Sequence, residues 1–384
     1  MFIAAADARV RFCGRTVATG DGSVRFDWPL TSVTFVVRGS TSVRLRMDGG
    51  KNIFAIDVGG TRSTLVTKRH AVEEYVVALD LDASAATTIT IVKRTEAKVE
   101  WGVLASSGSA VTMHGVLLDA GGELTPAPTL PERTLEVFGD SDTCAYGNEG
   151  PRTGSSIFSM INSLRPVEQD ASRSWAAIVG ASLNAQVHMI AWSGVGVAWN
   201  APLVNADAPM AGMWSRLLAT DPAAGTVHAS GGWLPDALLL FVGGNDYWTM
   251  GDAPPIGRRN PQRSEAAFVE AFAAWIRTLR DARPAPRPIL VLHCDEASGS
   301  CLPSPAAQQA FSEVSGRVLR AAVERADDAH THVLPLRGEP AVDFADDADW
   351  ARIGHWSVQG HAKVGRHVAA RLGERLGWGA PAVT

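Results

Sequence analysis

The sequence is poor in cysteine, and its cysteines form no recognisable framework. Four cysteines occur among 384 residues, and none of them has a partner at the Cys-x-x-Cys spacing of a zinc site. So few cysteines in so long a chain exclude a disulfide scaffold. We expect neither a metal nor another cofactor, and we expect the four thiols to be free or buried: Cys13, Cys144, Cys294 and Cys301.

Long apolar runs and clusters of like charge are also absent. No apolar stretch approaches the length of a membrane-spanning helix, and residues 1–6 are too short for the apolar part of a secretory signal. The formal net charge of -5 is small, and Lys and Arg do not gather in runs. These absences argue against nucleic acid or a membrane as a partner, and they predict a soluble protein without a signal peptide.

The remaining composition is that of a globular protein large enough for two domains. Hydrophobic residues make up 46% of the chain and charged residues 20%. A length of 384 residues favours two domains. Residues 121–131 contain two glycines and three prolines, which favour an extended connection. We predict one domain at residues 1–122, a linker at 123–131 and a second domain at 132–384.

Alternating hydrophobicity predicts an all-β first domain. Val43, Leu45 and Met47 alternate with polar residues, as in a strand that has one face in a core. Further short strands with turn residues between them are predicted at 24–28, 33–37, 53–58, 75–79 and 88–92. Many short strands at this spacing indicate a β-sandwich or jelly roll.

The second domain alternates strands with helices. Apolar periodicity predicts helices at 155–164, 172–183, 265–280, 305–326 and 358–376, and strands at 135–138, 187–191, 237–242, 289–293 and 331–334. This alternation predicts a parallel sheet with helices on both faces. The carboxyl ends of such strands meet at one edge, where ligands bind.

One motif in the first domain allows a different function. Asp57-Val58-Gly59-Gly60-Thr61 resembles the phosphate loop of sugar kinases with the actin-like ATPase fold. That fold requires further phosphate and adenosine motifs, which the sequence lacks. A Gly-Gly hairpin between two strands explains the residues without any ligand.

Four blocks of the second domain carry groups that acyl transfer requires. Ser141 follows the predicted strand 135–138, and it can be either an exposed nucleophile or an ordinary turn serine. Glycines follow the next strands at Ser193-Gly194 and at Gly243-Gly244-Asn245-Asp246, and His355 lies near the C-terminus. In this order the blocks resemble the SGNH hydrolase superfamily, also called GDSL esterases. The resemblance implies Ser141 as nucleophile, His355 as base, and the Ser141 N–H, the Gly194 N–H and the Asn245 amide as oxyanion donors.

A β-domain followed by an SGNH domain is similar to carbohydrate esterase family 2. The serine block, residues 139–149, resembles that of the family with departures at Asp142 and Ala145. The resemblance implies hydrolysis of O-acetyl esters on a carbohydrate or another small ester. Trp248 and Trp356, beside the blocks, are candidates for contact with a sugar ring. The alternative is a carbohydrate-binding protein whose esterase site has decayed.

The histidine block departs from the family at the acid. Arg352 and Ile353 stand where these families have an aspartate before the catalytic histidine. We therefore favour a dyad in which the carbonyl of Gly354 or of a neighbouring residue orients His355. An aspartate can still complete a triad by a different loop path; the candidates are Asp346, Asp347 and Asp349.

A second histidine, His361, competes for the role of base. Ser357 is a plausible N-cap before an apolar helical pattern, which places His355 on the loop and His361 inside the helix. Catalytic groups are found on loops more often than inside packed helices, so we favour His355 as the base and His361 as a packing residue.

Overall fold

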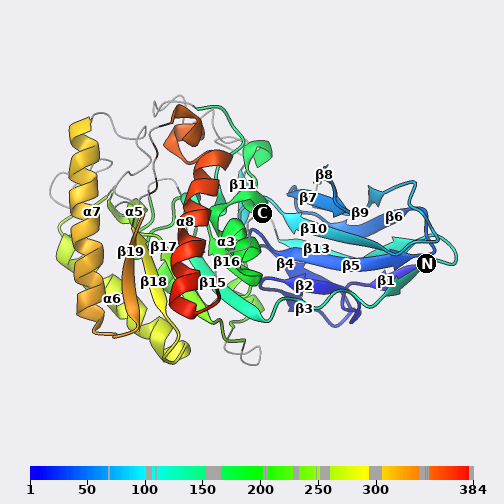
Figure 1. Ribbon diagram of the computed structural model, residues 1–384, viewed down its shortest axis with the longest axis horizontal. Helices are drawn as coiled ribbons and strands as arrows, with labels where there is room; N and C mark the ends of the chain where they lie inside the picture. The colour runs from blue at the N-terminus through cyan, green and yellow to red at the C-terminus, as the bar shows by residue number, and fades with distance from the viewer. Residues whose placement is uncertain are drawn as a thin grey trace.

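The computed structural model of the protein has two parts that lie end to end along its longest axis (Figure 1). An all-β part comes first in the chain, and an α/β part follows it. The structure describes residues 1–67, 70–100, 106–108, 110–152, 166–201, 204, 206–227, 233–247, 249–250, 260–293, 305–336, 342, 344 and 346–379.

Two antiparallel sheets form the first part. One has the strand order β3-β4-β13-β6-β9 with β1 paired to β13, and the other has the order β14-β5-β10-β7-β8 with β2 paired to β5. Leu45, Met47 and Phe35, from strands of both sheets, meet in one core. The predicted β-sandwich is confirmed, while its jelly-roll connection stays a prediction. The strands are β1 Phe2–Ala4, β2 Arg11–Cys13, β3 Val17–Ala18, β4 Val24–Phe26, β5 Ser32–Arg38, β6 Val43–Asp48, β7 Ile53–Val58, β8 Thr61–Val66, β9 Val72–Ala78, β10 Thr87–Lys93, β13 Val111–Leu118 and β14 Glu123–Thr125, with a separate pair β11 Lys98–Glu100 and β12 Ser106–Gly108.

The Gly-Gly motif of the first domain is a hairpin turn. Strands β7 and β8 pair antiparallel, with Val58 opposite Thr61. Gly59 and Gly60 both have positive φ, at 57° and 93°, which a two-residue turn of this kind requires. The hairpin interpretation is confirmed, and the resemblance to a kinase phosphate loop has no support in the fold.

Part of the predicted linker is a strand. Glu123–Thr125 is strand β14, whose Leu124 lies opposite Val37 of β5. Leu124 is buried between two less buried neighbours, so it closes the edge of the sandwich as an ordinary strand residue. The glycines before it and the prolines after it hid this short strand in the composition of the segment.

A five-stranded parallel sheet forms the second part. Its order is β16-β15-β17-β18-β19, with strands β15 Arg133–Gly139, β16 Ala185–Ala191, β17 Ala237–Phe241, β18 Ile289–His293 and β19 Thr331–Pro335. The helices are α1 Ser141–Cys144, α3 Trp175–Leu183, α4 Met210–Met213, α5 Gly244–Tyr247, α6 Glu265–Ala282, α7 Pro305–Ala326 and α8 Val358–Leu376. The predicted α/β fold is confirmed.

The helices cover both faces of this sheet (Figure 1). Leu135 and Val137 of β15 pack in one core with residues of α3 and α8, whereas Phe138 belongs to the core that contains residues of α6 and α7. Successive strand residues point to opposite faces, so β15 is apolar on both sides and lies inside the molecule. Its carboxyl end delivers Ser141 to the edge of the sheet.

The limits of two helices differ from the prediction, and one of them is α6, which ends at Ala282 instead of residue 280. The helix expected at 172–183 begins at Trp175, because residues 171–173 form a separate 3-10 turn and the Ser174 hydroxyl caps α3 by accepting a hydrogen bond from the Ala177 N–H. Ser172 therefore precedes the helix. The helix predicted at 155–164 lies outside the described residues.

Buried charges join the two parts. Arg15 of the sandwich pairs with Glu136 of β15 at 2.7 Å, and Arg283 pairs with the same carboxylate. Asp27 accepts hydrogen bonds from the backbone N–H groups of Ala219 and Thr220. Because an unpaired buried charge is costly, these contacts fix the sandwich against the α/β part.

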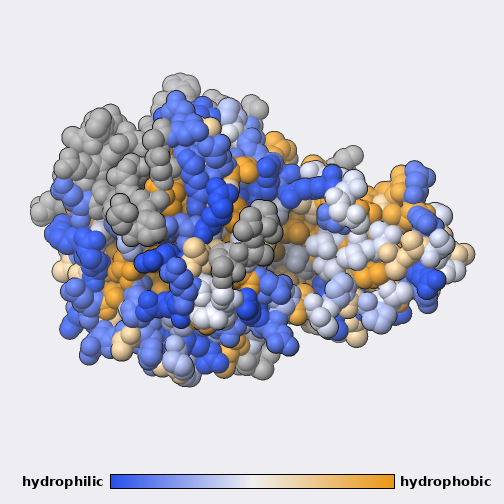
Figure 2. Space-filling model, viewed as in Figure 1, coloured by the Kyte–Doolittle hydropathy of each residue, from blue (hydrophilic) through white to orange (hydrophobic). Residues whose placement is uncertain are grey.

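Hydrophilic residues cover most of the α/β part on the face shown in Figure 2, and hydrophobic residues appear there in small areas. Among the described residues, no helix is long and apolar enough to cross a membrane. Of the four cysteines, the two described ones are free, with Cys144 buried and Cys13 half-buried; Cys294 and Cys301 lie outside the described residues.

Candidate active site

Ser141 is the first residue of α1, directly beyond the carboxyl end of β15. Asp140 is the N-cap, and its carboxylate accepts a hydrogen bond from the Asp142 N–H at 3.2 Å. Among the hydrogen bonds of the described residues, none involves the Ser141 hydroxyl or its backbone N–H. Both groups are therefore unengaged at the edge of the sheet where ligands of open α/β folds bind.

The imidazole of His355 is oriented by a main-chain carbonyl. Its Nδ1 lies 2.9 Å from the carbonyl oxygen of Arg352, and its backbone N–H donates to the same oxygen at 3.0 Å. Ile353 has φ 52° and ψ 33°, a left-handed conformation that costs free energy in a β-branched residue, and Gly354 follows at φ 70°. This turn folds the chain back so that a proton on Nδ1 is donated to the carbonyl, which leaves Nε2 free to accept one.

Contacts of the serine block reach the histidine block. The Tyr146 N–H donates to the carbonyl of Ser141 at 2.9 Å, and the Tyr146 ring lies 5.1 Å from the His355 ring. The carbonyl of Asn148 accepts a hydrogen bond from the Val358 N–H, which is the first residue of α8. Tyr146 and Asn148 thus link the serine block to the histidine block.

Asp142, one of the two departures from the family pattern, lies near this place as well. Its Oδ1 is buried and has no hydrogen-bond partner within the described part of the chain. Burial raises the pKa of the Asp142 carboxyl, and the charge of His355 lowers it. The neighbouring Asp140 carboxyl also has a raised pKa, first because of burial and then because of the Asp142 charge.

The three aspartates upstream of His355 have other partners. Asp349 is fully buried and pairs with Lys363 at 2.6 Å. Asp346 caps a 3-10 turn by accepting from the Ala348 N–H, and Asp347 is an exposed partner of Arg152. In the described part of the chain no carboxylate contacts His355 Nδ1, which faces the Arg352 carbonyl instead.

Gly194 lies in a tight loop after β16. Its φ is 76°, and a Cβ atom there would lie 2.1 Å from a methyl carbon of Val204, so both backbone and packing require glycine. No hydrogen bond of the described residues uses the Gly194 N–H. This N–H is therefore available to a ligand, as the SGNH resemblance implies.

Asp246 holds the loop that carries Gly194, a role that sequence reasoning missed. Its two carboxylate oxygens accept hydrogen bonds from the backbone N–H groups of Val197, Ala198 and Trp199 at 2.7 to 2.8 Å. Burial raises the pKa of Asp246 to about 7, although the three N–H groups act in the opposite direction. The only signal in the sequence was its position after Asn245, at the end of a strand.

Asn245 lies on α5 between the serine block and the Gly194 loop. Its amide nitrogen donates to Asp140 Oδ2 at 3.0 Å and to the carbonyl of Val195 at 3.1 Å. The two N–H bonds of the amide are thus directed at protein acceptors. To donate to an oxyanion, the Asn245 amide has to give up its hydrogen bond to one of these two acceptors.

His361 is a buried residue of α8. The Ser357 hydroxyl caps this helix by accepting from the Gln359 and Gly360 N–H groups, as predicted. His361 is fully buried, and its Nδ1 accepts a hydrogen bond from the Trp175 N–H at 3.2 Å. Burial, and secondarily the charge of His355, lowers the pKa of His361 to about 3. Its position inside the protein agrees with a packing role.

Trp356 does not face a substrate, so this expectation is wrong. The side chain is 2% exposed and stacks between Phe241 at 5.3 Å and Phe344 at 5.6 Å. Its position next to His355 in the sequence is misleading, because the chain turns and sends the indole into the core below α8. Trp248, the other candidate for sugar contact, lies outside the described residues.

Arg352 and Glu168 form a second feature that sequence reasoning missed. The Arg352 guanidinium binds both carboxylate oxygens of Glu168 in a fork-like pair, and Arg352 is 8% exposed. A Cβ atom at Gly147 or Gly150 would lie within 2.7 Å of the Arg352 side chain, so the arginine packs against the serine block. The residue in place of the family's acid thus fixes the turn whose carbonyl faces His355.

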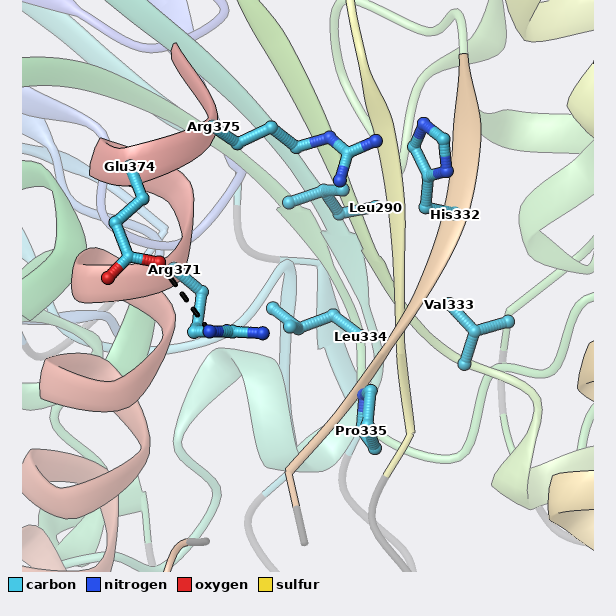
Figure 3. A pocket seen from close by; sticks show the side chains of 8 residues that line it. All are labelled: Leu290, His332, Val333, Leu334, Pro335, Arg371, Glu374 and Arg375. Atoms are coloured by element: carbon cyan, nitrogen blue, oxygen red, sulfur yellow. Dashed lines mark hydrogen bonds and ion pairs between the residues drawn. The ribbon is translucent and has the colours of Figure 1, made fainter. Parts of the chain in front are cut away.

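A separate pocket of about 340 Å³ lies between β19 and the last turns of α8 (Figure 3). Its lining includes His332 on the strand and Arg371 and Arg375 on the helix. Helix α8 begins just after His355 and has 19 residues. At 1.5 Å per residue its two ends are about 28 Å apart, so this pocket is not part of the site at Ser141.

Comparison with known proteins places both parts of the chain in known families. Residues 137–363 match the GDSL-like Lipase/Acylhydrolase family, and residues 12–128 match the Carbohydrate esterase 2 N-terminal family. The first match covers more than half of the chain. The order of the four sequence blocks and the β-domain before them therefore led to the right families.

Three similar proteins illustrate the relationship. The acetylxylan esterase/glucomannan deacetylase of Cellvibrio japonicus is 26% identical over 286 residues, which are 73% of this chain and 70% of that protein. The cellulase/esterase CelE of Acetivibrio thermocellus is 37% identical over 128 residues, which are 33% of this chain but only 14% of that much longer protein. The structure of a family two carbohydrate esterase from Clostridium thermocellum in complex with cellohexaose has a TM-score of 0.74 at 22% identity and covers 96% of this chain and 99% of its own.

Proposed function

Because the chain belongs to the GDSL-like lipase/acylhydrolase family, a family of ester hydrolases, we propose that it is a serine esterase that removes acetyl groups from a carbohydrate. The observation that carries the proposal is the contact between the serine block and the histidine block through Tyr146. The Ser141 hydroxyl has no hydrogen-bond partner among the described residues, and His355 contacts Tyr146 of the serine block and is oriented through Nδ1.

In this proposal the Ser141 oxygen attacks the ester carbonyl while Nε2 of His355 takes its proton. The histidine later returns the proton to the leaving alcohol, and a water molecule then releases acetate by the same route. The Arg352 carbonyl fixes the tautomer that this transfer needs, without adding a negative charge. The base is thus oriented by a neutral hydrogen bond.

The negative charge of the tetrahedral intermediate requires hydrogen-bond donors. The N–H groups of Ser141 and Gly194, which have no partner among the described residues, and the amide of Asn245 are the proposed donors. Asn245 reaches the oxyanion by giving up its contact with Asp140 or with the Val195 carbonyl. Loss of one such donor typically lowers kcat on the order of 10²–10³-fold.

The substrate class rests on the related proteins. The Cellvibrio japonicus relative is an acetylxylan esterase and glucomannan deacetylase, and the Clostridium thermocellum structure contains cellohexaose. Acetylated plant polysaccharides are therefore the proposed substrates. The alternative, a carbohydrate-binding protein with a decayed esterase site, was motivated by the missing acid and by the altered histidine block. The Arg352 carbonyl, 2.9 Å from Nδ1 of His355, supports the esterase in preference to it.

The test compares the protein with its Ser141→Ala variant. Release of p-nitrophenol from p-nitrophenyl acetate and of acetate from acetylated glucomannan should be at least 10³-fold faster for the unchanged protein, because the variant lacks the nucleophile. Equal rates on both substrates would reject the esterase. Binding of the polysaccharide without turnover would favour the carbohydrate-binding alternative.

A further inference from the structure

A short segment of the sandwich is buried beside the proposed active site. Residues 93–97 begin with Lys93, the last residue of strand β10, and all five are buried. We call residues 93–97 the docking segment. Ala97 belongs to the hydrophobic core that includes residues of α6 and α7, and the Arg94 carbonyl accepts a hydrogen bond from the Ala171 N–H. The segment is therefore part of the packing of the second domain although it leaves a strand of the first.

The backbone of the docking segment is held in place from both domains. The Lys93 ammonium donates to the carbonyls of Thr95 and Glu96, each at 2.7 Å. The Glu96 N–H donates to the Gln169 side-chain oxygen, and the other end of that amide donates to the Cys144 carbonyl at 2.9 Å. Glu96 is thus placed by contacts with its own segment and with the serine block.

The carboxylate of Glu96 contacts two of the SGNH blocks at once. Its Oε2 accepts a hydrogen bond from the Ser193 N–H at 2.7 Å and faces the Cys144 thiol at 3.9 Å. Ser193 directly precedes Gly194, and the thiol also faces the carbonyl of Ser141 at 3.6 Å. The same thiol lies 3.4 Å from the Ser193 hydroxyl, which closes the link between the two blocks.

A buried carboxylate needs compensation, and Glu96 has it. It is 9% exposed and accepts a backbone hydrogen bond. Burial lowers the pKa of Lys93 in the same segment to about 7, and the charges of Asp27 and Glu96 act in the opposite direction. Removal of this carboxylate leaves the half-buried Ser193 N–H without this acceptor, which costs free energy. The peptide bond between Trp192 and Ser193 then loses the contact that fixes its orientation. The next peptide bond, which carries the Gly194 N–H, is attached to the same Ser193 Cα, so its position depends on that contact as well.

We propose that Glu96, a residue of the β-sandwich, is a positioning residue that holds the Ser193–Gly194 backbone against the serine block, so that both domains are needed to complete the active site. This inference rests on the proposed esterase function. It assigns the sandwich a part in the reaction that is separate from any binding of polysaccharide. Glu96 does not touch the substrate; it acts through the Gly194 donor and the Cys144 turn.

The experiment compares Glu96→Ala, Glu96→Gln and Glu96→Asp with Arg62→Ala. Arg62 also joins the two domains, through Asp170 and Ser172, but it contacts neither the serine block nor the Gly194 loop. We expect Glu96→Ala to lower kcat for p-nitrophenyl acetate on the order of ten- to hundredfold with KM nearly unchanged, less than the loss of an oxyanion donor itself. Glu96→Gln retains an acceptor oxygen and should have most of the wild-type kcat. Arg62→Ala should have the wild-type kcat.

Two readouts separate positioning from a general effect on folding. Glu96→Asp keeps the negative charge, but its side chain is one methylene group shorter and moves the carboxylate away from the Ser193 N–H. This variant should therefore have a lower kcat although its charge is the same. Affinity for phenylboronic acid, which forms a tetrahedral adduct at a serine, should fall in parallel with kcat/KM in the Ala and Asp variants. If Glu96→Ala does not fold, the Gln and Asp pair gives the same comparison.

The outcomes distinguish the two levels of the argument. If the wild-type protein hydrolyses the ester no faster than Ser141→Ala, both the proposed function and this inference are rejected. If the wild-type protein is active but the Glu96 variants keep the full rate, the function is retained and the inference is overturned. The same conclusion follows if Arg62→Ala loses as much rate as Glu96→Ala.

Discussion

Nδ1 of His355 lies 2.9 Å from the carbonyl oxygen of Arg352, the residue that stands where the related families have an aspartate. The arginine side chain points away from the imidazole and binds Glu168, while its main chain faces the ring. One residue therefore joins two functions that are usually separate: its carbonyl orients the base, and its guanidinium anchors the turn.

The first prediction is that no aspartate completes a triad with His355. Asp346→Asn, Asp347→Asn and Asp349→Asn should each keep kcat/KM within about tenfold, roughly 1.4 kcal/mol, whereas His355→Ala should lose most of the activity. Asp349→Asn breaks a buried pair with Lys363, so it should lower the free energy of unfolding instead. A loss in any Asp variant close to that of His355→Ala would restore the triad.

The second prediction concerns the Arg352–Glu168 pair. Glu168→Gln and Arg352→Met should each lower kcat about tenfold with little change in KM, because the turn that presents the carbonyl to His355 loses its anchor. A pH–rate profile should show the same loss across the plateau. Arg371→Ala, which breaks an exposed pair with Glu374, is the matched control and should keep the rate. Wild-type kcat in both variants of the pair would contradict the anchoring role.

The third prediction concerns Asp246. Asp246→Asn replaces one acceptor oxygen by an NH₂ group that faces backbone N–H donors, so the loop that carries Gly194 loses part of its support. We expect kcat to fall at least tenfold, and the free energy of unfolding to fall by about 1–3 kcal/mol for the unsatisfied groups. Steady-state kinetics and urea unfolding measure the two effects. A variant with lower stability but unchanged kcat would show that the loop tolerates the loss.

The fourth prediction is a pH effect on stability at His361. Its pKa in the folded protein, about 3, lies below the ordinary value of 6.5, so between these values the unfolded chain binds a proton that the folded chain does not. The stability is therefore fully present above pH 6.5 and is lost as the pH falls toward 3, by up to about 1.4 kcal/mol per pH unit. His361→Gln has no such group. The advantage of wild type over this variant in urea unfolding should shrink by about 2 kcal/mol between pH 6.5 and pH 5, and a constant difference would contradict the buried, neutral histidine.

The sequence was sufficient where a pattern is local. Alternation at Val43, Leu45 and Met47 predicted a strand of the sandwich, and the Ser357 cap predicted the start of α8, since both depend on neighbours within a few residues. The order of the four blocks led to the right family for the same reason, because each block is a strand end that can be seen in a few letters.

The sequence was insufficient where a role depends on distant partners. Glu96 acts on Ser193, and Arg352 acts with Glu168, across separations of about a hundred residues or more that no local pattern reports. Trp356 was misjudged because an aromatic residue next to a catalytic block has the same letters whether it faces solvent or stacks between two phenylalanines. Only the path of the turn at Ile353 decides between these outcomes.

The docking segment also sets an order of assembly during protein synthesis. A ribosome releases strands β1 to β14 before any residue of the parallel sheet, so the sandwich can close while the catalytic half of the chain is still being made. In the complete fold the carboxylates of Asp27 and Glu96 are buried and accept hydrogen bonds from backbone N–H groups of the second half. The N–H groups that bind these carboxylates are synthesised later than the sandwich, so the sandwich provides the acceptor against which the Ser193–Gly194 turn takes its shape.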